Sequence, residues 1–141
     1  EEAEYSFTHA DYHPMNLLFK DEKLFAILDF EDIKVYPLLS ALGFGVYKLI
    51  RQMLVNANPD EVKKISPSLV NRWIDGWRKS FPKAEVTAHQ LAIGAKYRVL
   101  ESIRILLHNY FRCGNSTYNY DLAKQIGSLF EIDDIFDSSA I

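Results

Sequence analysis

The chain has 141 residues, of which 48% are hydrophobic and 25% charged, and its formal net charge is −3. This length and composition are typical of one globular domain with its own core, and the weak net charge gives no electrostatic footprint for nucleic acid. The sequence has no apolar run of the roughly 18 residues that a membrane span needs, and its single cysteine, Cys113, excludes an internal disulfide and favours a cytoplasmic location.

Charge is unevenly distributed along the chain. Residues 1–35 carry nine acids and three bases, a balance of −6, whereas the remaining residues carry ten acids and thirteen bases, a balance of +3. An acidic surface around the first segment suits a metal ion and slightly favours an amino-bearing substrate. The same acids are equally consistent with an ordinary solvated surface.

The first quarter of the chain shows the pattern of short strands. Tyr5–Thr8 is predicted to form a strand that leads into a loop, and apolar runs on both sides of Asp21–Glu22 predict a hairpin with a polar turn. The numbers of paired residues should then sum to about 44 or 45, which places Asn16 opposite Leu28 or Asp29. Opposed Cα atoms lie about 4.5–5.5 Å apart in such a hairpin. An amide oxygen and a carboxylate at that separation suit Mg²⁺.

Polar residues also alternate through the loop before this hairpin. Asp11 lies five positions before Asn16, on a segment stiffened by Pro14, and such a carboxylate suits the deprotonation of an attacking hydroxyl. His9 precedes Asp11 by two positions, so in extended backbone both side chains point the same way. The alternatives are that Asp11 caps its own turn, that Asn16 is a turn residue, and that Asp29 caps a following helix.

This pattern resembles a known family. His9, Asp11 and Asn16 have H-x-D-x-x-x-x-N spacing, and with Leu28–Glu31 they resemble the catalytic loop and metal-binding segment of the aminoglycoside phosphotransferase and choline kinase family, a branch of the protein-kinase-like fold. The resemblance covers about the first 35 residues. It implies an ATP-dependent kinase that phosphorylates a hydroxyl of a small molecule, such as an amino alcohol, an aminoglycoside or a sugar-like compound. Asp11 would be the catalytic base, and Asn16 and Asp29 would hold Mg²⁺ with ATP.

The neighbouring residues have supporting roles in this interpretation. His9 is expected to hydrogen-bond backbone near Asp29, and His13 to stabilise the loop. Glu31 and Asp32 are possible contacts for the substrate or a second metal ion. Glu31 also replaces the Gly of the D-F-G motif, which is common in the small-molecule branch and argues against a protein kinase.

The rest of the chain is predicted to be helical, because apolar residues recur there at helical spacing. Gly43–Gly45 lies inside the first helix and is interpreted as a close-packing site rather than a nucleotide loop. The predicted helices are 36–56, 59–65, 66–81, 87–112 and 117–136, with a stop at Cys113–Ser116. The inward residues of the fourth helix should be Leu91, Val99, Ile103, Leu106, Leu107 and Tyr110. Those of the last helix should be Leu122, Ile126, Leu129 and Phe130.

We therefore predict an α+β, mostly helical fold, in which a short β-hairpin carrying the catalytic loop is followed by four or five packed helices. Residues 1–141 would be a single domain, with the catalytic loop and metal-binding hairpin in 1–35 and a helical subdomain in 36–141. This arrangement resembles the carboxyl-terminal lobe of a kinase-like fold. The nucleotide-binding lobe is expected to be absent from the chain, since only eight residues precede the motif and no G-x-G-x-x-G occurs. The chain alone should then be inactive.

Two other function classes remain open. The first is a non-catalytic kinase-lobe module that binds partners or acts as a scaffold. Its surface toward the absent lobe should be apolar and could support a homodimer. The second is a metal-dependent hydrolase, because His9, Asp11 and His13 alternate and could supply three ligands from one segment.

Overall fold

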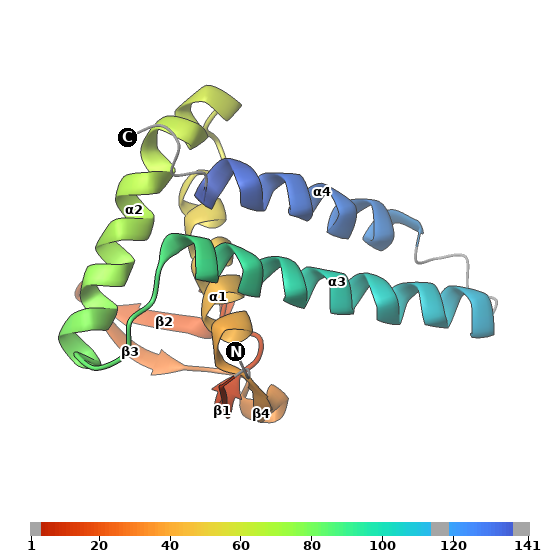
Figure 1. Ribbon diagram of the computed structural model, residues 1–141, viewed down its shortest axis with the longest axis horizontal. Coiled ribbons are helices and arrows are strands. Elements are labelled where there is room, and N and C mark those ends of the chain that lie inside the picture. Colours follow the sequence, from red (N-terminus) through yellow and green to blue (C-terminus); the bar gives the residue numbers. More distant parts are fainter. Residues whose placement is uncertain (1–3, 114–118, 137–141) are drawn as a thin grey trace.

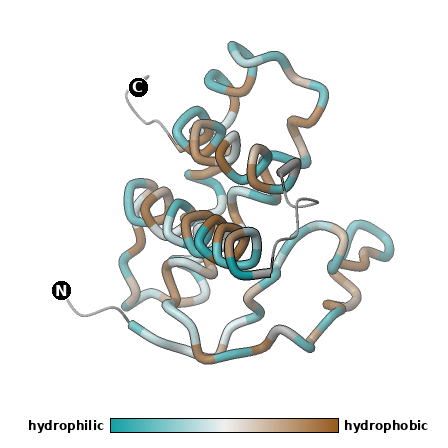
Figure 2. The backbone as a smooth tube through the Cα atoms, turned by 90° about the vertical axis from the view of Figure 1, so that its right-hand side faces the viewer, coloured by the Kyte–Doolittle hydropathy of each residue, from teal (hydrophilic) through white to brown (hydrophobic). Residues whose placement is uncertain are grey.

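The computed structural model describes residues 4–113 and 119–136 (Figure 1). In this part of the chain, short strands lie at one end of a set of α-helices (Figure 1, Figure 2). The strands are β1 (Tyr5–His9), β2 (Leu17–Lys20), β3 (Lys23–Ile27) and β4 (Ile33–Pro37), with 3₁₀ helices at Pro14–Asn16 and Phe30–Asp32. The helices are α1 (Leu38–Met53), α2 (Pro59–Ser80), α3 (Ala88–Cys113) and α4 (Asn119–Phe136). The predicted α+β, mostly helical fold is confirmed.

The β2–β3 hairpin has the predicted register at its open end. Leu17 pairs with Ile27, so the position numbers sum to 44, and the Leu28 N–H donates to the Asn16 carbonyl at 2.8 Å. A bulge shifts the register by one nearer the turn. Both residues of the Asp21–Glu22 turn have positive φ, 49° and 62°, which matches the twist that a two-residue hairpin turn requires.

The fourth strand was not predicted. Ile33–Pro37 pairs antiparallel with β1, from Tyr5 opposite Pro37 to His9 opposite Ile33. The helix predicted to begin at Tyr36 therefore begins at Leu38. Periodicity alone missed the strand because its partner lies about 28 residues away, and only pairing with β1 satisfies its backbone hydrogen bonds.

A second correction concerns α2. The predicted helices 59–65 and 66–81 are one continuous helix with Pro67 in its interior. Just before the proline, Ser66 Oγ donates to the Val62 carbonyl at 2.7 Å. The core side chains on both sides of the proline are Val62, Val70 and Ile74. Their packing offsets the hydrogen bond that a proline removes from a helix interior.

The helices α1 and α3 cross at close range. A Cβ atom on Gly43 would lie 2.1 Å from the Leu91 carbonyl oxygen, and one on Gly94 would lie 2.1 Å from that of Leu39. The prediction that Gly43–Gly45 is a close-packing site is confirmed. The largest fully buried side chains around this crossing and its neighbours are Tyr47, Leu91, Ile132, Val46, Val70 and Val99.

The start of α3 was predicted correctly. The Thr87 N–H donates to Gln90 Oε1 at 2.9 Å, and the Gln90 N–H donates to Thr87 Oγ1 at 3.2 Å, which is a capping box. Leu91 and Val99 are buried as expected, whereas Tyr110 is exposed, because the far half of α3 extends away from the core beside α4 (Figure 1). The remaining predicted residues, Ile103, Leu106 and Leu107, are half-buried.

The predicted inward face of α4 was partly wrong. Phe130 is 70% exposed and Ile126 is also exposed, whereas Ser128, Ile132 and Ile135 are buried. The other two predicted residues, Leu122 and Leu129, are half-buried. The apolar residues of α4 surround the helix, so their spacing does not select one face; contact with α3 and α2 does. The predicted stop at 114–116 and the Cys113 side chain lie outside the described residues. No helix within 4–113 and 119–136 is long and apolar enough to cross a membrane.

Candidate active site

The loop between β1 and β2 is closed by the side chain of Asn16. This residue is 8% exposed, and its Nδ2 donates to the backbone carbonyl of Asp11 at 3.0 Å. Its own backbone N–H donates to the His13 carbonyl at 3.0 Å. Both ends of the loop are therefore held to the start of the hairpin, and the Asn16 side-chain oxygen is left as an acceptor.

The Asp11 carboxylate has a partner that was not predicted from the sequence. His13 Nε2 lies 3.2 Å from Asp11 Oδ2, and His13 Nδ1 accepts the Met15 N–H at 3.2 Å. Because Nδ1 accepts a hydrogen bond, it carries no proton, so the proton of the neutral ring is on Nε2 and is donated to Asp11. His13 thus orients one carboxylate oxygen and leaves the other one available. The alternative in which Asp11 caps its own turn is not what the loop shows.

His9 connects the first strand to the end of the hairpin. Its Nε2 lies 2.7 Å from the Leu28 carbonyl oxygen, so Nε2–H is the donor. This carbonyl directly precedes Asp29, and the hydrogen bond expected from the sequence is present. The imidazole also meets the Phe30 ring edge-on, at 5.5 Å between centroids. His9 therefore contacts the residues on both sides of Asp29, the Leu28 backbone and the Phe30 ring.

Asp29 follows β3 in a left-handed conformation, with φ 62° and ψ 60°. It stands at the N-cap position of the 3₁₀ helix Phe30–Asp32 but makes no side-chain capping hydrogen bond, so the helix-cap interpretation is wrong. The residue before it, Leu28, faces Asn16 across the hairpin, and its N–H donates to the Asn16 carbonyl. Asp29 is therefore one position beyond the residue that faces Asn16, at the same open end of the hairpin.

These two residues fit a hard divalent cation. The Asn16 oxygen and the exposed Asp29 carboxylate are the kinds of ligand that Mg²⁺ prefers, and this ion commonly needs only one or two protein carboxylates beside substrate phosphates. A zinc site fits less well. Within residues 4–113 and 119–136, no three His, Cys, Asp or Glu side chains are placed to hold one metal ion. His9 Nε2 is also engaged by Leu28, so the hydrolase alternative based on His9, Asp11 and His13 is not supported.

Residues 2–57 match the family model APH, the phosphotransferase enzyme family. This segment carries the phosphotransferase family pattern. It spans β1 to α1 and includes Asp11, Asn16 and Asp29, so the resemblance inferred from the motif is confirmed. No curated protein and no solved structure matches the chain.

The remaining predicted contacts of this phosphotransferase segment are less defined. Glu31 is exposed on the 3₁₀ helix directly after Asp29, and its contact with substrate or metal stays a prediction. The Asp32 side chain lies outside the described residues.

A pocket of about 430 Å³ opens beside the loop between β1 and β2. Asp11 and His13 form one wall, and α1, α3 and α4 form the others. Its cationic residues are Lys48, Arg51, Arg98 and Lys124. Sequence reasoning missed them because they are spread over three helices and share no spacing; the only signal was the +3 balance after residue 35.

Proposed function

We propose that this chain carries the catalytic residues of an ATP-dependent kinase that transfers the γ-phosphoryl group to a hydroxyl of a small molecule. The phosphotransferase family match supports the reaction class. The single observation that carries the proposal is the hydrogen bond from the Asn16 amide to the Asp11 carbonyl. It joins a candidate base to a hairpin end that also presents Asp29, so one local unit holds the base and two oxygen ligands.

Asp11 is the base in this proposal. The Nε2–H of His13 occupies Oδ2, and the other carboxylate oxygen is free to accept the proton of the attacking hydroxyl. His13 is a positioning residue, because it holds the carboxylate without touching the reacting atoms. The Pro14–Asn16 3₁₀ helix keeps the loop short between Asp11 and the hairpin.

Asn16 and Asp29 would hold Mg²⁺, which when bound with ATP neutralises charge on the phosphates. The chain's own part is to keep the two oxygen ligands at one end of the hairpin. His9 contributes by holding the Leu28 carbonyl at 2.7 Å, which restrains the backbone directly before Asp29.

The test is Asp11→Asn in this chain combined with a nucleotide-binding lobe, because activity is expected only with that lobe, and Mg-ATP-dependent phosphotransfer is assayed. We expect the rate to fall about 10²–10⁴-fold, the usual contribution of a general base, with little change in stability. Asp21→Asn is the matched control: it makes the same change at the exposed turn of the same hairpin, where φ is 49° and asparagine is well tolerated. Full activity in Asp11→Asn would contradict the assignment.

One observation favours a second candidate, a non-catalytic binding module. Large apolar side chains are exposed on the strands, with Phe7 79%, Phe19 64% and Phe25 70% accessible. Exposed apolar side chains that form a patch mark interaction surfaces, and a homodimer could use those of the hairpin. Sedimentation of the chain at high concentration should show self-association that Phe19→Glu abolishes. The same change at exposed Phe111, on α3, should have no effect. A wild-type monomer would exclude the homodimer.

A further inference from the structure

The pocket beside Asp11 has a strongly cationic wall. Lys48 and Arg51 come from α1, Arg98 from α3 and Lys124 from α4, while Asp11 is the one carboxylate among the described residues that line it. The four cations are far apart in sequence, so the fold has brought them together. Such a concentration of like charge raises the local concentration of anions.

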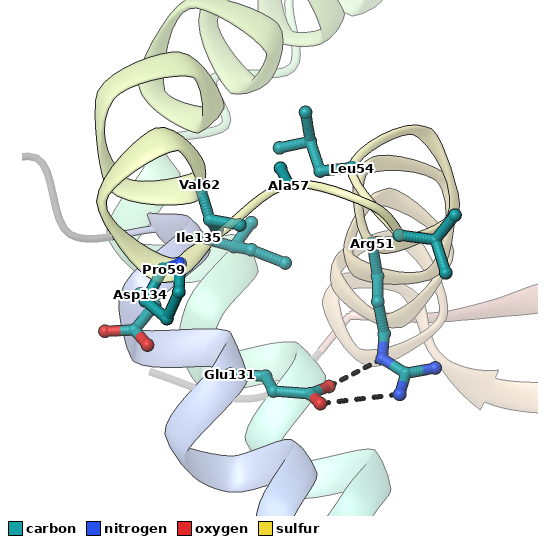
Figure 3. Close-up of a pocket in the computed structure, with 9 residues that line it drawn as sticks. Arg51, Leu54, Ala57, Pro59, Val62, Glu131, Asp134 and Ile135 are labelled. Carbon is teal, nitrogen blue, oxygen red and sulfur yellow. Dashed lines mark hydrogen bonds and ion pairs between the residues drawn. The ribbon is translucent and has the colours of Figure 1, made fainter.

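Most of this charge is not neutralised within the protein. Arg51 is the exception, because its Nε lies 2.6 Å from Glu131 Oε2 at the edge of a neighbouring pocket (Figure 3). In the part of the chain that the structure describes, no carboxylate lies within ion-pair distance of Lys48, Arg98 or Lys124. Three cations therefore line one pocket without an ion-pair partner among the described residues.

Arg98 is the clearest example of a pocket cation without an ion-pair partner. Its Nη1 donates to Ser102 Oγ at 3.0 Å, and its guanidinium carbon lies 5.5 Å from the centroid of the Phe44 ring. Its Nε is buried and has no hydrogen-bond partner among the described residues. A buried, charged donor without an acceptor is costly in a folded protein, so this Nε–H is available to an acceptor that is not part of the protein.

Lys48 lines the same pocket. Its Nζ is 5.0 Å from the Phe44 centroid and 5.7 Å from that of Tyr47, so the aromatic rings hold the ammonium in place. Burial lowers the pKa of Lys48, and the charges of Arg51 and Lys124 lower it further, while Asp11 opposes them. The protein thus maintains a crowded group of cations next to its candidate base.

We infer that this pocket binds a carboxylate or phosphate group of the acceptor substrate, with Lys48, Arg98 and Lys124 as its binding residues. The inference rests on the proposed function, because it requires the substrate hydroxyl to face Asp11. It replaces the slight preference for an amino-bearing substrate, which was based on acids near the start of the chain. Among the described residues of that segment, Asp11 is the only acid that lines the pocket.

The first test measures anion binding without nucleotide or Mg²⁺. Inorganic sulfate is titrated into the full chain by calorimetry at constant ionic strength, and we expect saturable 1:1 binding. The double variant Lys48→Met/Arg98→Gln should bind at least tenfold more weakly. Lys64→Met, which removes one positive charge from an exposed site on α2, should bind as the wild type does. Asp11→Asn should bind sulfate more tightly, since it removes the carboxylate from the pocket.

The second test identifies the anionic group by displacement of bound sulfate. Four three-carbon probes are compared: glycerate, glycerol 3-phosphate, glycerol and 2-amino-1,3-propanediol. Displacement by glycerate or glycerol 3-phosphate, and not by glycerol or the amine, supports the inference. Whether glycerate or glycerol 3-phosphate displaces sulfate better decides between a carboxylate and a phosphate. The inference would be overturned by displacement of sulfate by the amine, by a lack of sulfate binding, or by equal sulfate affinity in the wild type and the double variant.

These tests separate the pocket from the reaction. Sulfate binding that depends on Lys48 and Arg98, together with full phosphotransfer activity in Asp11→Asn, would mean that the pocket is correct and the proposed base is wrong. Phosphotransfer that depends on Asp11, without saturable sulfate binding, would mean the reverse.

Discussion

The side-chain amide of Asn16 holds the backbone carbonyl of Asp11 at 3.0 Å, and this single hydrogen bond links the candidate base to the candidate metal ligand. The bond is largely buried, because Asn16 is almost inaccessible to solvent. The two polar atoms of the Asn16 side chain therefore have different roles. The amide nitrogen stabilises the loop, and the amide oxygen is available to a metal ion.

Asn16→Asp separates these two roles. It keeps an oxygen ligand but replaces the donor with a carboxylate that repels the Asp11 carbonyl. We expect the free energy of unfolding to fall by about 1–3 kcal/mol, the cost of a buried unsatisfied group, as measured by urea denaturation. Asn71→Asp on the exposed face of α2 is the control and should change stability little. Unchanged stability in Asn16→Asp would mean that the bond does not support the loop.

His13 offers a test of positioning. His13→Ala removes the donor that holds Asp11 Oδ2 at 3.2 Å. We expect a lower kcat with an unchanged KM for ATP, since the carboxylate loses its orientation while the hairpin keeps its ligands. His13→Gln, which retains a side-chain N–H donor, should restore part of the rate, and His89→Ala on the exposed start of α3 should not alter it. An equal loss in His13→Ala and His13→Gln would argue against orientation as the cause.

The α1–α3 crossing gives a prediction about stability. A methyl group at Gly94 would lie 2.1 Å from the Leu39 carbonyl oxygen, which is rigid backbone. Gly94→Ala should therefore destabilise the protein by about 1–3 kcal/mol, the typical cost of overpacking. Gly76 on α2 has open space at its Cβ position, so Gly76→Ala should instead stabilise the protein by about 0.5–1 kcal/mol. Thermal unfolding of both variants tests these two predictions. Similar shifts in Tm for Gly94→Ala and Gly76→Ala would show that the α1–α3 crossing can relax.

Glu131 gives a prediction about pH. Burial tends to raise the pKa of its carboxyl, but hydrogen bonds from Arg51 and Tyr47 outweigh burial and bring that pKa below its usual value. A lowered pKa in the folded state means that the ionised carboxylate stabilises the protein above the unfolded-state pKa of 4.5, and that this stability is lost as the pH falls through the folded value.

Glu131→Gln should therefore be less stable than the wild type at pH 7, with a difference that shrinks below pH 4.5. Urea denaturation at several pH values measures this trend. Arg51→Met removes the same ion pair from the other side and should show the same dependence (Figure 3). A difference that stays constant down to acidic pH would contradict the predicted linkage.

Local features of the protein were predictable from the sequence because they depend on neighbouring residues. The hairpin register follows from the two-residue turn at Asp21–Glu22, and the start of α3 follows from the contact between Thr87 and Gln90. The spacing of Asp11 and Asn16 indicated the resemblance to the phosphotransferase family for the same reason, since a short loop joins them, and residues 2–57 match that family's model.

Only the tertiary structure decided features that depend on distant segments. Residues 33–37 form a strand because they pair with β1. The helix α2 continues through Pro67 because core contacts on both sides of the proline stabilise it. The inward face of α4 was set by its neighbours rather than by its own periodicity.

The cationic pocket is the clearest case. Lys48, Arg98 and Lys124 are separated by 50 and 26 positions, and nothing in their local sequence relates them to one another or to Asp11. Sequence by itself predicted the candidate base and the candidate metal ligands, because these lie on one loop and one hairpin. The cationic lining of the pocket was decided by how three helices pack, because side chains that far apart in the chain become neighbours only when the core forms.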